Sequence, residues 1–67
     1  MKVYQLLDKL ISFANIQIFR GDKMVLSFLA SDFRNNRLLS HEFNSEVESW
    51  VVATECTIII TVKEVNP

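Results

Sequence analysis

Two carboxylates, Glu46 and Glu48, lie two residues apart in a segment whose alternating pattern predicts a strand. Side chains two apart on a strand point the same way and lie roughly 6–7 Å apart. Paired carboxylates at such distances serve glycosidases, but those enzymes also need a deep substrate cleft, which so short a chain can hardly build. We therefore interpret the two glutamates as solvated or interface carboxylates.

The other residue types that carry chemistry stand alone. The chain has one histidine, His41, and one cysteine, Cys56, so neither has the neighbours that a zinc site or a redox pair requires. The sequence carries no recognised catalytic motif. The sequence therefore predicts a protein that is not an enzyme, with no metal site and no cofactor, and His41 is interpreted as a surface residue.

Four cationic side chains lie near two predicted loops and are candidates for contacting an anion. Arg34 and Arg37 flank two asparagines, and a planar guanidinium beside amide donors suits a phosphate or a carboxylate. Arg20 and Lys23 lie at the first predicted turn and would add to this site. A solvated helix face is the competing interpretation of the cluster.

The elements that position these residues follow from hydrophobic periodicity. Apolar residues at offsets 0, 3, 4, 7 and 8 over residues 3–11 predict an amphipathic helix. Ser31 or Asp32 is a candidate cap for a second, short helix. Residues 40–45 are interpreted as a polar connector held by Phe43. The expected anchors of the short helix beneath a sheet are Phe33, Leu38 and Leu39.

A first hairpin is predicted by period-two alternation over residues 15–20 and 24–29. Gly21 between them suits the first central position of a type II′ turn, because glycine takes a positive φ without steric cost. Two registers stay open. A two-residue loop pairs Ile18 with Val25 and Phe19 with Met24, whereas a three-residue loop aligns Ile16 and Ile18 with Phe28 and Leu26.

A second hairpin is predicted over residues 46–54 and 57–63, with Glu55-Cys56 as its loop. A two-residue loop pairs Ala53 with Ile58, and the same parity then runs along both strands. The face expected to meet the core carries Val47, Val51, Ala53, Ile58, Ile60 and Val62. The opposite face pairs Val52 with Ile59, Trp50 with Thr61, and Glu48 with Lys63.

The order helix, hairpin, short helix, hairpin predicts a single α+β domain over residues 1–67. We expect a four-stranded antiparallel sheet with both helices on one face. The uncovered face should then carry Trp50, Val52 and Ile59, joined by Phe19 in the second register of the first hairpin. Exposed aromatic and aliphatic side chains mark an interaction surface, here with Glu48 and Lys63 as a charged rim.

Charge and hydropathy narrow the classes of partner. Seven basic and eight acidic residues give a net charge of −1, which argues against non-specific nucleic-acid binding. No apolar run approaches the roughly 20 residues that span a membrane, and no signal peptide is visible, so a cytoplasmic location is expected. A core of this size supplies little stability, which favours a homodimer or a higher homo-oligomer.

Four stretches of the chain form a recognisable pattern: the opening Val3-x-x-Leu6-Leu7-x-Lys9-Leu10, then Ile16-x-Ile18, Asn36-x-Leu38-Leu39 and the closing Ile58-Ile59-Ile60-Thr61-Val62. This pattern resembles that of small accessory proteins from prophages and mobile elements of Gram-positive bacteria. It implies a phage accessory protein, a group whose members often block host defence as anti-CRISPR inhibitors or as sponges for nucleotide signals. It implies no catalytic residue.

The sequence thus favours a non-enzymatic interaction protein that binds and blocks a bacterial defence protein in an infected or lysogenic cell. Trp50, Val52 and Ile59 would be its anchors. One alternative is an oligomeric binder of a nucleotide messenger, using Arg34 and Arg37. A nucleic-acid-binding module is a third hypothesis, in which a dimer pools Arg20, Lys23, Arg34 and Arg37 into a basic stripe.

Overall fold

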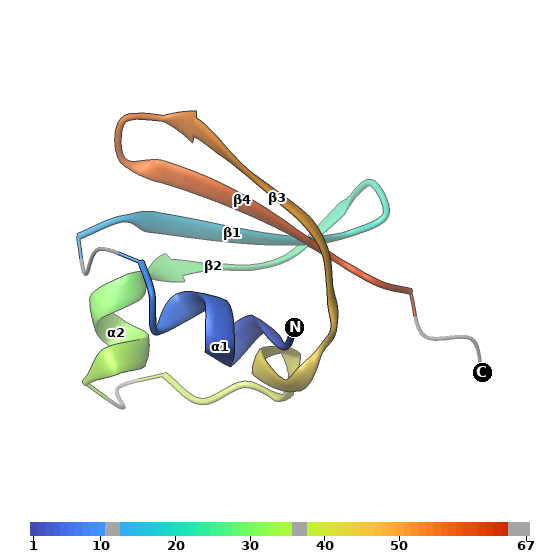
Figure 1. Ribbon diagram of the computed structural model, residues 1–67, viewed down its shortest axis with the longest axis horizontal. Helices are drawn as coiled ribbons and strands as arrows, with labels where there is room; N and C mark the ends of the chain where they lie inside the picture. Colours follow the sequence, from blue (N-terminus) through green and yellow to red (C-terminus); the bar gives the residue numbers. More distant parts are fainter. Residues whose placement is uncertain (11–12, 36–37, 65–67) are drawn as a thin grey trace.

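The computed structural model describes residues 1–10, 13–35 and 38–64, and it shows short helices on one face of a four-stranded sheet (Figure 1). The helices are α1 (Val3–Leu7) and α2 (Ala30–Arg34), with a 3-10 helix η1 (His41–Asn44). The strands are β1 (Asn15–Arg20), β2 (Lys23–Leu29), β3 (Val47–Thr54) and β4 (Thr57–Val62). The predicted α+β class is therefore confirmed.

The sheet is mixed, so the prediction of an all-antiparallel sheet is wrong. Its order is β2-β1-β4-β3, and β1 and β4 are parallel neighbours, with Ile16 beside Ile58. The course of the chain between the hairpins explains this. Helix α2 directly follows the end of β2, whereas η1 lies at the other end of the sheet, where Glu42 contacts Arg20 of β1 (Figure 1). Strand β3 thus starts at the same end as β2, and β4 runs in the direction of β1.

The first hairpin combines the two registers that the sequence left open. Next to the turn, Phe19 pairs with Met24, as a two-residue loop requires, and Gly21 has a φ of +63°. The register then shifts between Ile18 and Phe19, because Val25 has no partner on β1. Beyond this bulge the pairs are Ile18–Leu26 and Ile16–Phe28. The bulge therefore keeps the glycine turn and still aligns the apolar residues that face the core.

The core lies between the sheet and the helices. Phe43 of η1 contacts two rings edge to face: Phe28 of β2 at a centroid distance of 5.4 Å and Phe33 of α2 at 5.0 Å. Phe43 therefore holds the connector against the core, as predicted, although the connector includes a turn of 3-10 helix. The buried apolar residues are Val3, Leu6, Leu7, Ala14, Ile16, Ile18, Phe28, Ala30, Phe43, Ile58, Ile60 and Val62.

Both helices differ in detail from the prediction. Helix α1 ends at Leu7, and Ile11, where the predicted helix ended, lies outside the described residues. Helix α2 begins at Ala30, directly after β2, with Leu29 at the N-cap and no side-chain cap, so neither Ser31 nor Asp32 caps it. Leu38 packs against the core, whereas Leu39 is 84% exposed and is not an anchor.

Candidate interaction surface

Strand β3 forms one edge of the sheet and is almost entirely exposed. Three consecutive apolar residues near its middle are accessible: Trp50 is 45% exposed, and Val51 and Val52 are each 56% exposed. Aromatic and β-branched residues favour extended backbone, which explains why this segment is a strand. We call Trp50, Val51 and Val52 the β3 edge patch.

The register of the second hairpin differs by one residue from the prediction. The two-residue loop Glu55-Cys56 is confirmed, since Thr54 pairs with Thr57. Beyond it, however, Ala53 has no partner on β4, and Val52 rather than Ala53 lies opposite Ile58. Because side chains alternate along a strand, this bulge exchanges the two faces of the middle of β3.

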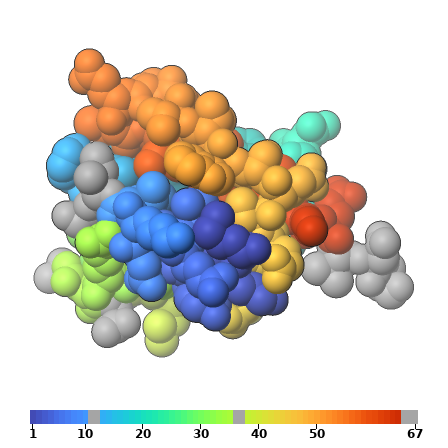
Figure 2. Space-filling view, viewed as in Figure 1, coloured from blue at the N-terminus to red at the C-terminus, as the bar shows by residue number. Residues whose placement is uncertain are grey.

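The exchange corrects the predicted placement of the tryptophan. Trp50 lies opposite Ile60, whose side chain is fully buried on the helix side, so Trp50 and Val52 also face the helix side. Val51 instead faces the open side, opposite Ile59. Trp50 stays accessible because β3 packs chiefly against β4, and the orange side chains of this hairpin stand at the upper edge of the molecule (Figure 2).

The other predicted interface residues lie on the open face or at its rim. Ile59 and Phe19 are both half-buried there, opposite Val51 and Met24 respectively, so they share a face with Val51 and not with Trp50. Exposed apolar side chains of the open face also occur on β2, where Met24 is 49% exposed. The predicted surface is therefore divided between two faces that meet at β3.

The predicted charged rim is not formed as expected. Glu48 is exposed at a second bulge of β3, between Val47 and Ser49. The backbone N–H of Lys63 donates to the carbonyl of Glu46 at 2.9 Å. No ion pair among the described residues joins Glu48 to Lys63.

The candidate anion-binding side chains do not converge. The Arg34 guanidinium donates to the backbone carbonyls of Leu7, Asp8 and Leu10, so it caps carbonyl groups at the end of α1 and just after it. Lys23 is exposed at the first turn. Arg37 lies outside the described residues. The remaining cation, Arg20, is engaged within the fold.

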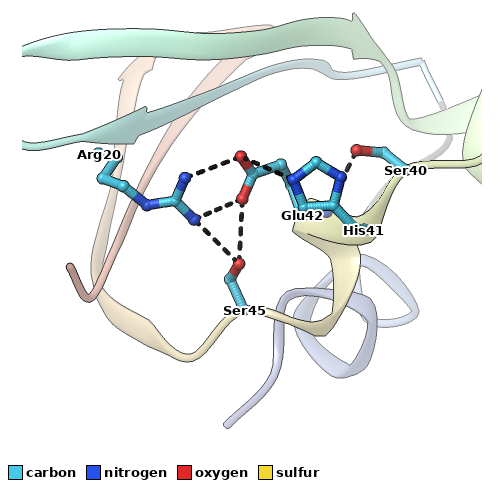
Figure 3. Close-up of polar contacts among 5 residues, drawn as sticks. All are labelled: Arg20, Ser40, His41, Glu42 and Ser45. Carbon is cyan, nitrogen blue, oxygen red and sulfur yellow. Dashed lines mark hydrogen bonds and ion pairs between the residues drawn. The ribbon is translucent and has the colours of Figure 1, made fainter. Parts of the chain in front are cut away.

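Arg20 forms a partly buried network with η1 (Figure 3). Its Nη1 donates to Glu42 Oε2 at 2.9 Å, and its Nη2 donates to Glu42 Oε1 at 2.5 Å and to Ser45 Oγ at 3.3 Å. Ser45 Oγ donates in turn to Glu42 Oε1 at 3.1 Å, and the Glu42 N–H donates to Ser40 Oγ at 3.2 Å. The network ties the end of β1 to the segment that leads into β3.

The pairing of Arg20 with Glu42 shifts the pKa of both groups. The hydrogen bond from Arg20 lowers the pKa of the Glu42 carboxyl, although the side chain of Glu42 is 8% exposed. The same hydrogen bond raises the pKa of Arg20. The exposed His41 imidazole lies 3.7 Å from Glu42 Oε2. Glu42 was not predicted as a site residue, because its partner Arg20 is 22 residues away and only the adjacent Phe43 indicated burial.

An open pocket of about 450 Å³ lies beside the network. Its lining includes Lys2, His41, Lys63 and two carboxylates, Glu46 and Glu64. Glu46 accepts from the N-terminal amino group at 3.2 Å and pairs with Lys2 at 3.2 Å, and these contacts lower its pKa. The lining thus carries both signs of charge, and its first carboxylate is already paired.

Within residues 1–10, 13–35 and 38–64, no group of three or more His, Cys, Asp or Glu residues could hold a metal ion. None of the helices in these ranges is long and apolar enough to cross a membrane. Comparisons with family models, curated proteins and solved structures find no match to the chain. The β3 edge patch is accessible and apolar, with Trp50, Val51 and Val52 each 45–56% exposed.

Proposed function

We propose that this chain is a non-enzymatic protein–protein interaction module that docks through the β3 edge patch. One observation carries the proposal: three consecutive apolar side chains, Trp50, Val51 and Val52, are 45–56% exposed on an edge strand. Exposed apolar clusters mark interaction sites, and tryptophan is among the commonest energetic anchors of interfaces.

The partner that we propose is a bacterial defence protein, which the small protein would bind and block in the cytoplasm of an infected or lysogenic cell. This class of partner is proposed on the resemblance of the sequence pattern to that of phage accessory proteins. Because the side chains of the β3 edge patch are apolar, the contact with this partner would be largely apolar. Its two faces, with Trp50 on one and Val51 on the other, would let the edge enter a groove of the partner or extend its sheet.

The two alternatives receive less support from the geometry. A binder of nucleotide messengers would use Arg34, but that guanidinium donates to three backbone carbonyls of its own chain. A basic stripe for nucleic acid would need Arg20, which is paired with Glu42. Neither guanidinium can meet a phosphate without first leaving these partners.

The test compares matched truncations at the two edges of the sheet. Trp50→Ala removes a side chain that is 45% exposed on β3, and Leu29→Ala removes one that is 42% exposed on β2. Tagged wild type is used to capture partners from a bacterial lysate, and the captured partner is purified and titrated against each variant. We expect Trp50→Ala to weaken binding at least tenfold and Leu29→Ala to leave it unchanged. Equal binding by Trp50→Ala, with an unchanged circular dichroism spectrum, would refute the proposal.

A further inference from the structure

We infer that the contact with the partner protein continues from the β3 edge patch across the open face of the sheet, and that the partner covers this face with an apolar surface free of charged side chains. This inference rests on the proposed function, since it concerns the same partner. It extends the contact from one edge strand to all four strands, and it states the chemistry of the surface that covers them.

One apolar side chain from each strand contributes to a band across the open face. Val51 of β3 lies opposite Ile59 of β4, and Val51 is 56% exposed. Phe19 of β1 lies opposite Met24 of β2, and Met24 is 49% exposed. The two pairs are neighbours, because Ile59 lies beside Gln17 and Phe19 is the next residue of β1 on that face. We call Val51, Ile59, Phe19 and Met24 the open-face band, which shares Val51 with the β3 edge patch.

The open face around the band carries no charge. Pairing and alternation place three residues of each strand on this face, and within the four described strands none of them is Asp, Glu, Lys, Arg or His. The band is flanked by hydroxyl and amide side chains, those of Gln17, Ser27, Ser49 and Thr61. About 25–35% of the residues on the surface of a soluble domain are charged, so a solvated face of this size would carry about three or four. The seven basic and eight acidic residues of the chain all occupy other positions.

The lack of charge determines which class of partner fits the open face. The phosphate groups of a nucleic acid or of an anionic membrane are held by cations, and this face supplies none. A charged side chain of a protein partner would lose its hydration here without meeting an opposite charge. The helices α1, α2 and η1 all lie on the other face of the sheet, so none of them covers the band (Figure 1). The open face is therefore complementary to an apolar protein surface, with the flanking hydroxyl and amide groups at the rim of the contact.

The experiment compares two substitutions that each replace an amide by a carboxylate of the same size. Gln17→Glu places one charge beside the open-face band, whereas Gln5→Glu places one on α1, where Gln5 is exposed. The partner captured by the wild-type chain is purified and titrated against each variant by isothermal titration calorimetry. We expect Gln17→Glu to raise the Kd at least tenfold and Gln5→Glu to leave it unchanged. Met24→Lys is a second variant at an exposed position of the band, on the edge opposite to β3, and it should also weaken binding.

The outcomes separate this inference from the proposed function. Unchanged binding by Gln17→Glu and Met24→Lys, with Trp50→Ala still weakening it, would overturn the inference and leave the proposed function standing. Equal binding by all three variants, or a wild-type chain that captures no partner, would overturn both. Leu29 pairs with Asn15 beyond the band, so Leu29→Ala remains a control here as well. Sedimentation equilibrium of the wild-type chain alone tests the other occupant, because a dimer that Gln17→Glu dissociates would assign the face to a second copy and overturn the inference.

Discussion

The two edges of the sheet belong to hairpins that are built alike, yet β2 is partly buried and β3 is almost entirely exposed. Each hairpin has a two-residue loop and a bulge near it, at Val25 in the first and at Ala53 in the second. In β2, Phe28 is buried, and Val25 and Leu26 are half-buried. In β3, every residue after Val47 is exposed.

The difference comes from what lies beneath each edge. Helix α2 directly follows β2 and packs against it, and Phe43 of η1 contacts Phe28. Strand β3 instead has β4 as its chief partner (Figure 1). The β2 edge therefore contributes to the core, and the β3 edge leaves apolar side chains accessible.

The largest expected effect is a contrast between Phe28→Ala and Trp50→Ala. Removing the Phe28 ring from the core should lower the free energy of unfolding by about 3–5 kcal/mol, which approaches the whole stability of a domain this small. Removing the Trp50 ring should cost on the order of 1 kcal/mol, since it is 45% exposed. Urea denaturation followed by circular dichroism measures both. Equal losses would show that the two edges do not differ in this way.

The second prediction concerns the network that joins the end of β1 to the segment leading into β3. Glu42→Gln removes the charge that accepts both Arg20 nitrogens, and it should lower the free energy of unfolding by about 1.5–3 kcal/mol at pH 7. The folded-state pKa of Glu42 lies below its unfolded value of about 4.3, so this stabilisation is present above that pH. It is lost as the pH falls through the folded-state pKa.

The variant should therefore show a shallower loss of stability between pH 5 and the acid range than the wild type does. Glu46→Gln is the control, because the pKa of that carboxyl is also lowered but its partners are exposed. The effect of Glu46→Gln should fade at high salt, whereas the effect of Glu42→Gln should persist. An acid transition that is the same in Glu42→Gln and the wild type would contradict the assignment.

The alternation of inward-facing and outward-facing side chains along the strands made much of the sheet predictable. Alternation in β1 and β4 correctly places Ile16, Ile18, Ile58 and Ile60 towards the core. The same argument fails in β3, because Trp50, Val51 and Val52 are all apolar and the pattern is equally apolar in either register. Only the bulge at Ala53, which depends on how the hairpin packs, decides the face. The predicted faces of β3 were therefore exchanged, since Trp50 and Val52 lie on the helix side and Val51 lies on the open side.

Tertiary contacts of high sequence separation account for the other differences. The parallel pairing of β1 with β4 goes with the position of η1, which contacts Arg20 through Glu42 and Phe28 through Phe43. Likewise, Arg34 was predicted to be available to an anion, but it lies near carbonyls more than 20 residues away in the chain. No local pattern of residue types encodes such pairs.

The smallest expected effect is the difference in the free energy of unfolding between a substitution in the first turn and one in the second. Gly21 has a φ of +63°, which alanine adopts at a cost of roughly 1–2 kcal/mol, so Gly21→Ala should destabilise the fold by about that amount. A Cβ there would also lie 2.8 Å from Glu64 Oε1, the end of a flexible side chain that can move. The matched change in the other turn, Cys56→Ala at an exposed position, should stay within about 0.5 kcal/mol.

Glu64→Ala in the Gly21→Ala background isolates the backbone contribution. If the positive φ causes the loss, removing the carboxylate restores little stability, and Gly21→Asn is better tolerated than Gly21→Ala, because asparagine accepts the left-handed region. Full recovery in the double variant would assign the loss to the steric contact instead. In either case, the loss should fall on the β1–β2 hairpin, and hydrogen exchange along β3 should change least, since that edge depends on β4 and not on the first turn.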